Sequence, residues 1–309
     1  MKRLPWFLAL LMAVPAFGSA LGTSSRSVIP AEAQQVICVD YRALKNSPTA
    51  LALKDRVLPD NMKEFETSLK AVGINPEQDV EQLTFASYRN KDNTLQVFGI
   101  AQGTFSVKKI TAKLALKKIK GVKYHDSVLY PMSGGQDMTF LDDSTMLFGQ
   151  RTSVKGALDA RDGYRQPLDI SSQMGDMMNA VQNGPIWSVL DQLGTQNMMR
   201  STLGDAAKLA DYDTIKKRIL GSHYIMDFQN GVNFDLDIVT NDPMTAATLS
   251  SVLKAGVMFR KMNASGVEKV ALDSVTVDSS SADLKLHFKS DEKRFQSLLQ
   301  SDLFASVSR

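Results

Sequence analysis

The chain has 309 residues, a formal net charge of +3 and one cysteine. So small a net charge provides no large electrostatic field for holding nucleic acid, and nucleic acid is therefore not expected as a partner. A single cysteine excludes an intramolecular disulfide, so that stability has to come from the core. At 43% hydrophobic residues the chain can build one large domain or two of ordinary size.

The first 20 residues predict a cleavable secretory signal. Lys2 and Arg3 precede an apolar run over 4–17, and the small residues at 18–20 follow it. This is the order of a secretory signal, and the run is shorter than the roughly 20 residues that a membrane-spanning helix needs. We therefore expect cleavage near Ala20 and an exported protein, periplasmic or secreted, without a transmembrane span in its mature part. An uncleaved anchor is the alternative interpretation.

Residues 21–35 are small, polar and aperiodic, and predict a flexible tether. An N-terminal module is expected over 36–161, and Cys38 in its first strand is interpreted as a small core residue. The predicted elements of the module follow the hydrophobic periodicity. In chain order they are a strand at 36–40, two helices within 41–72, a hairpin of strands 83–88 and 95–105, a lysine-rich helix at 107–120, strands at 122–130, 138–141 and 145–149, and a helix at 153–160.

A polar linker is predicted over 162–184, and a C-terminal module over 185–309. Asn241 or Asp242 is the expected N-cap of its longest helix, with Pro243 at the first helical position. The predicted elements are a strand at 185–190, helical material over 192–220, a hairpin of strands 222–228 and 232–240, a helix at 244–262, strands at 269–277 and 282–288, and a helix at 291–299.

The two halves share this order of elements, which predicts an internal duplication. The expected fold class is α+β, with two similar modules of antiparallel sheet and helices packed on one face of each. A single α+β domain whose two meanders resemble each other by chance is the alternative.

The sequence contains no recognisable catalytic pattern. The three histidines are isolated from one another, and the motifs of zinc proteases, phosphate-binding loops and serine hydrolases do not occur. His125, Asp126 and Ser127 are adjacent in sequence but are not expected to converge, and Asp235 and Asp237 predict a solvated strand face. We therefore expect no metal, no cofactor and no enzymatic activity, although a hydrolase site assembled from distant residues stays open.

Two groups of side chains suggest binding instead. Six lysines lie within 107–120 without a neighbouring acid, and such a helix can hold an anionic lipid or polymer: Lys108, Lys109, Lys113, Lys117, Lys118 and Lys120. Five methionines near the middle of the chain could line an apolar groove for a ligand or partner: Met174, Met177, Met178, Met198 and Met199. A core-packed helix with solvated lysines, and a core filled with methionine, are the competing interpretations.

Several short segments support a resemblance. They are Ile29-Pro30-Ala31-Glu32 ahead of Val39-Asp40, Val72-Gly73-Ile74-Asn75, Gly103-Thr104-Phe105, and Leu141-Asp142-Asp143 before Phe148-Gly149. Together they resemble a diffuse group of uncharacterised exported bacterial proteins built from duplicated α+β modules. The resemblance implies a fold type and a place at the surface or in the periplasm, and it implies no activity.

These observations leave three hypotheses. The first is a non-enzymatic envelope protein that binds a ligand, an envelope protein, an anionic polymer or a lipid. The second is a periplasmic carrier of lipid or another apolar ligand, and the third is a hydrolase with an unrecognised site.

Overall fold

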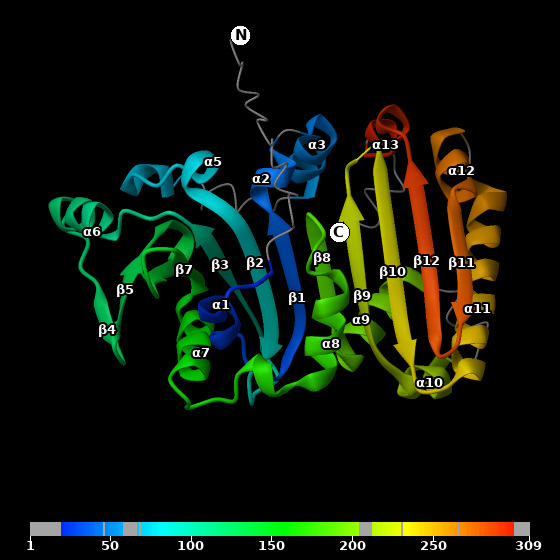
Figure 1. Cartoon of the computed structure of the whole chain (residues 1–309), viewed down its shortest axis with the longest axis horizontal. Helices are drawn as coiled ribbons and strands as arrows, with labels where there is room; N and C mark the ends of the chain where they lie inside the picture. The colour runs from blue at the N-terminus through cyan, green and yellow to red at the C-terminus, as the bar shows by residue number, and fades with distance from the viewer. Residues whose placement is uncertain are drawn as a thin grey trace, which may run out of the picture.

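The computed structural model describes residues 20–45, 47–57, 67, 69–203, 212–229, 231–264 and 266–299. Residues 1–19 of the predicted secretory segment lie outside these residues, as does most of the predicted helix that follows Pro59. The described part has an α+β fold, as expected (Figure 1).

Twelve antiparallel strands form one sheet, in the order β11-β12-β10-β9-β8-β1-β2-β3-β7-β6-β5-β4. β1 lies between the two halves: Cys38 is opposite Thr84 of β2 and Trp187 of β8. The two halves therefore share a continuous sheet, while the internal duplication stays a prediction. The strands are β1 (Ala33–Asp40), β2 (Val80–Arg89), β3 (Leu95–Gly103), β4 (Val122–Tyr124), β5 (Ser127–Pro131), β6 (Gln136–Phe140), β7 (Thr145–Gln150), β8 (Ile186–Leu190), β9 (Ile219–Asp227), β10 (Val232–Thr240), β11 (Val275–Ser280) and β12 (Asp283–Ser290).

The helices connect these strands and pack on the sheet. The longest, α11, begins as predicted, because the Asp242 side chain accepts a hydrogen bond from Thr245 N and Pro243 follows at once. Short 3₁₀ turns span Ser133–Gly135, Leu168–Ile170 and Lys216–Arg218. The α-helices are α1 (Thr23–Ser27), α2 (Tyr41–Leu44), α3 (Pro48–Val57), α5 (Pro76–Asp79), α6 (Val107–Leu116), α7 (Arg151–Arg161), α8 (Ser172–Val181), α9 (Gln192–Leu203), α10 (Tyr212–Ile215), α11 (Pro243–Asn263), α12 (Gly266–Asp273) and α13 (Glu292–Leu299).

Helices cover both faces of the sheet in the N-terminal half, where one covered face was expected. On the first face, α7 and α8 pack over Val36, Cys38 and Trp187. On the second face, α6 packs over β6 and β7, and α9 and α11 pack over Leu236 and Ile238 of β10. Alternate side chains of each strand point to opposite faces, so the two cores lie back to back across the sheet.

The first face lies open at its C-terminal end. Asp235 of β10, Lys285 of β12 and Asp278 of β11 are exposed there. The opposite side of the same strands is apolar, with Leu236, Ile238 and Leu284 buried. The strand face that was predicted from Asp235 and Asp237 thus lies opposite a buried apolar face of the same strand.

Two segments that were predicted to be a flexible tether and a linker are packed into the core. Residues 21–35 include α1 and the beginning of β1, and Leu21, Val28 and Ile29 are buried, so they do not form a flexible tether. Residues 162–184 contain α8, which places Met174, Met177, Met178 and Val181 in the core. The polar composition of this segment hides an apolar stripe at helical spacing, so the linker prediction is wrong about its local structure.

Two predicted strands also differ from the structure. The strand at 122–130 is a hairpin of β4 and β5, because His125 adopts a positive φ of 50° and turns the chain. The strand at 269–277 begins only at Val275, since residues 266–273 form α12. Val267, Val270 and Ala271 are spaced for one side of a helix, and this period decides the local structure.

We predict that Met178→Ala lowers the free energy of unfolding by about 2–5 kcal/mol, because it leaves a cavity beneath α8 in the core. Met178 is fully buried, whereas Ile170 nearby is 57% exposed. Ile170→Ala is the matched control and should change stability by no more than about 0.5 kcal/mol. Urea unfolding followed by circular dichroism measures both, and equal effects would contradict the assignment of α8 to the core.

Candidate functional site

The lysine-rich segment forms an exposed surface at one end of the molecule (Figure 1). Within α6, Ile110 and Leu114 are one turn apart and both are buried against the sheet, which turns the lysines outward. Lys118 then adopts a positive φ of 58° and ends the helix. We define the lysine surface as the six predicted lysines with one more from β4, all exposed: Lys108, Lys109, Lys113, Lys117, Lys118, Lys120 and Lys123.

The charge of the lysine surface is not balanced locally. The chain has no carboxylate from Val107 to His125, and no described carboxylate forms an ion pair with these lysines. Lys117 Nζ donates a hydrogen bond to Ala71 O at 2.7 Å, which fixes one ammonium group. The surface therefore attracts anions, and salt weakens that attraction because the charges face water.

Apolar side chains lie among these lysines. Leu116 is 84% exposed, and Val122 and Val128 of the β4–β5 hairpin are 47% and 40% exposed. A pocket of about 250 Å³ is lined by Lys109 and Lys113 of this surface, and the carboxylate of Asp79 also lines it. This combination of ammonium groups and apolar side chains is typical of surfaces that bind anionic interfaces.

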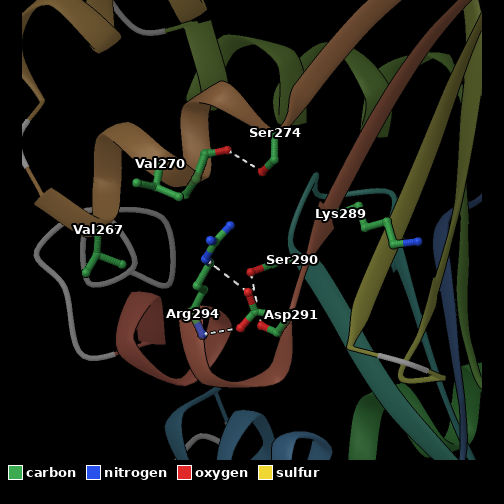
Figure 2. A pocket seen from close by; sticks show the side chains of 8 residues that line it. Val267, Val270, Ser274, Lys289, Ser290, Asp291 and Arg294 are labelled. Carbon is green, nitrogen blue, oxygen red and sulfur yellow. Dashed lines mark hydrogen bonds and ion pairs between the residues drawn. The ribbon is translucent and has the colours of Figure 1, made fainter.

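A second pocket, of about 210 Å³, lies between α12, α13 and β12 (Figure 2). Val267 and Val270 form its apolar wall. Arg294 Nε is 3.0 Å from Asp291 Oδ2, and the Ser290 hydroxyl donates to the carbonyl oxygen of Asp291. Arg294, Asp291 and Ser290 are thus engaged in local contacts with one another.

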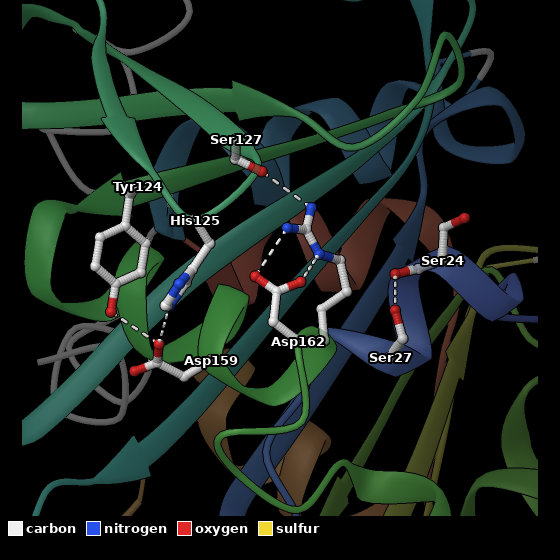
Figure 3. A network of polar contacts seen from close by, with 8 residues as sticks. Ser24, Ser27, Tyr124, His125, Ser127, Asp159 and Asp162 are labelled. Carbon is white, nitrogen blue, oxygen red and sulfur yellow. Dashed lines mark hydrogen bonds and ion pairs between the residues drawn. The ribbon is translucent and has the colours of Figure 1, made fainter.

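A polar network joins the β4–β5 hairpin to α7 (Figure 3). Tyr124 donates its hydroxyl proton to Asp159 Oδ1 at 2.8 Å, and His125 Nε2 lies 3.0 Å from the same oxygen. The His125 ring also stacks on Tyr164, with ring centroids 4.5 Å apart. Arg161 of α7 pairs with Asp162 and donates to the Ser127 hydroxyl. The network fastens the hairpin that carries Lys123 to a buried helix.

The other two histidines are paired with carboxylates as well. His287 Nδ1 lies 2.7 Å from Asp235 Oδ1, and His223 Nε2 lies 3.4 Å from Asp237 Oδ2. The predicted solvated carboxylates of β10 therefore have partners on the two neighbouring strands. In the described part of the chain, no three His, Cys, Asp or Glu side chains gather as a metal site would require.

The predicted apolar contact residues occupy the interior. Met174, Met177, Met178 and Met199 are all buried, and Met198 is half-buried against the core of the C-terminal half. They fill space between helices and sheet and do not line either of the two pockets. The structure thus places these methionines in the core, which was the competing interpretation.

Cys38 is also a core residue. It lies on the central strand with 1% of its surface exposed, next to the Thr84 hydroxyl. Burial raises the pKa of its thiol to about 12, so the thiol stays protonated at neutral pH and is a poor nucleophile.

No family model and no curated protein match this chain. Among solved structures, crystal form I of TP0453 is similar over 91% of this chain and 97% of that chain, with a TM-score of 0.51 and 7% sequence identity. Crystal form IV of TP0453 covers 89% of this chain and 96% of that chain, with a TM-score of 0.45 and 8% identity. The likeness to form I shows a common fold that includes both halves of the sheet. None of the helices in the described ranges has the length and apolar character to span a bilayer.

We predict that Asp159→Asn lowers the pKa of Tyr124. Burial first, and the adjacent Asp159 carboxylate second, raise the pKa of Tyr124 to about 12, because both disfavour the phenolate. Removing the charge of the carboxylate should move the titration of Tyr124 to lower pH. Burial should still keep the pKa of Tyr124 above its ordinary value. A pH titration by ¹³C NMR of ring-labelled tyrosine measures this, with Tyr124→Phe to assign the signal. Asp126→Asn, in the same hairpin, is the control, and an unchanged Tyr124 titration in Asp159→Asn would contradict the contact.

Proposed function

We propose that this chain is a non-enzymatic, exported binding protein of the bacterial envelope that attaches to an anionic surface through the lysine surface. The observation that carries the proposal is the exposure of seven lysines without a described carboxylate partner. The predicted secretory signal supports the envelope as the compartment, where anionic lipids and polymers supply such surfaces.

Within this class of partner, the exposed apolar residues favour a lipid surface. Leu116, Val122 and Val128 lie among the lysines, and they gain free energy when they enter the headgroup boundary of a bilayer. A polymer in water offers charge alone. Rigid attachment also supports this function, because the Asp159 network and the buried side of α6 hold the lysines in place.

The carrier hypothesis has less support. It needs an apolar cavity large enough for a lipid, and the methionines that were expected to line it are packed in the core. The hydrolase hypothesis also has less support, since no described Ser or Cys side chain forms a hydrogen bond with the histidine of a histidine–aspartate pair.

We predict that replacing Lys109, Lys118 and Lys120 together by Gln weakens binding to anionic vesicles on the order of 100-fold, because each lysine near an anionic surface contributes about 1 kcal/mol. Co-sedimentation with phosphatidylcholine vesicles, with and without phosphatidylglycerol, measures the change. Binding of the unaltered protein should need phosphatidylglycerol and should weaken as salt is raised.

The matched control replaces three exposed lysines of β12 and α13 by Gln, namely Lys285, Lys289 and Lys293. It removes the same charge from the other end of the molecule and should leave binding unchanged. Equal losses in the two triple variants would mean that net charge alone drives binding. Failure of the unaltered protein to bind these vesicles, with binding to a soluble polyanion instead, would assign the surface to a polymer.

A further inference from the structure

α11 presents an exposed apolar side to solvent at the end of the molecule opposite the lysine surface (Figure 1). Its inner side is buried on β10, β11 and β12 through Ala246, Leu249 and Leu253. Its outer side exposes three large hydrophobic side chains: Met244 is 77%, Met258 68% and Met262 77% exposed.

These methionines belong to one stripe of the helix. We take the line that runs along the helix surface through Ser251, parallel to the helix axis. At 3.6 residues per turn, five other residues lie within about 40° of this line: Met244, Ala247, Ala255, Met258 and Met262. This line is opposite the buried side of α11. We call these six residues the α11 stripe.

The α11 stripe is electrically neutral. Lys254 and Lys261 flank it, but Lys254 is 3.5 Å from Asp278 and Lys261 forms an ion pair with Asp273. The Ser251 hydroxyl donates to Ala247 O within the helix, so covering it leaves no unpaired donor. A stripe without net charge or open polar groups suits an apolar protein surface, and it differs in this respect from the lysine surface.

From Met244 to Met258 the order of side-chain sizes is symmetric about Ser251, and Met262 lies beyond this symmetric part. If two α11 helices pack antiparallel about a two-fold axis at Ser251, each Met244 meets Met258 of the second copy and each Ala247 meets Ala255. Large residues then pack at both ends and small residues in the middle, where the backbones approach most closely. The helix dipoles also oppose each other, which is favourable.

We propose that α11 is the interface of a homodimer, in which the α11 stripes of two copies pack antiparallel about Ser251. The helix is about 31 Å long and about 10 Å wide, so the two copies together bury about 600 Å² through this contact, which is less than the roughly 1,200 Å² of a standard stable interface. The dimer should therefore be weak, with a dissociation constant on the order of micromolar.

Disulfide crosslinking tests the register of this dimer. The only native cysteine, Cys38, is buried and does not compete. The two-fold axis brings the Ser251 positions of two copies together, so Ser251→Cys should crosslink under mild oxidation. The two Ala247 positions lie about 12 Å apart along the helix, beyond disulfide reach. Ala247→Cys should therefore stay monomeric alone and crosslink only when mixed with Ala255→Cys.

Sedimentation equilibrium tests the dimer without oxidation. The unaltered protein should associate in the micromolar range, and Ser251→Arg should weaken association at least tenfold, because two guanidinium groups meet at the axis. Thr276→Arg, on exposed β11 outside the stripe, is the control and should associate normally. Circular dichroism checks that each variant is folded.

Three results would overturn the proposal. The first is that the unaltered protein remains monomeric at about 100 μM. The second is that the Ser251→Arg variant associates as strongly as the control. The third is that Ala247→Cys alone crosslinks as efficiently as its mixture with Ala255→Cys. The lysine variants of the vesicle experiment should dimerise normally, so this test is independent of the proposed attachment to an anionic surface.

Discussion

The pairing of β1 with both β2 and β8 is the constraint on which the rest of the structure depends. Val36 and Cys38 of β1 are buried between strands that belong to different halves of the chain. Without β1, two separate sheets would each have an unpaired edge at the centre of the molecule, which water or another chain would have to satisfy. Because β1 fills this position, the helices at the two ends are attached to a single rigid body.

Local pattern was sufficient to predict most elements of the fold. Apolar and polar residues alternate over 232–238, which is typical of a strand with one buried face. Asp242 followed by Pro243 is typical of a helix start. Each pattern needs only a few residues to predict its element. α8 was missed because Ser, Gln and Asn dominate its sequence, although Met174, Met177, Met178 and Val181 keep helical spacing. The shared sheet could not be predicted, since no local feature of β1 tells which distant strand will lie beside it.

The same division between local and distant information applies to the candidate site. The lysine surface is contiguous in sequence, and the apolar positions of Ile110 and Leu114 already indicate which side of α6 faces outward. The pairing of His287 with Asp235 depends on the register of β12 against β10, and that of His125 with Asp159 depends on a turn and on how α7 packs. Register and packing are set by the whole sheet, so these contacts required the structure.

The length of the sheet has a consequence for avidity. The twelve-stranded sheet is about 50 Å wide in the hydrogen-bonding direction, with α6 near one end and α11 near the other. Two copies joined through α11 would hold their lysine surfaces at the far ends of a stiff, bivalent particle. Once one end is attached, the effective concentration of the second end near the same surface rises, and weak individual contacts become a lasting attachment. A shorter or hinged sheet would give less of this gain.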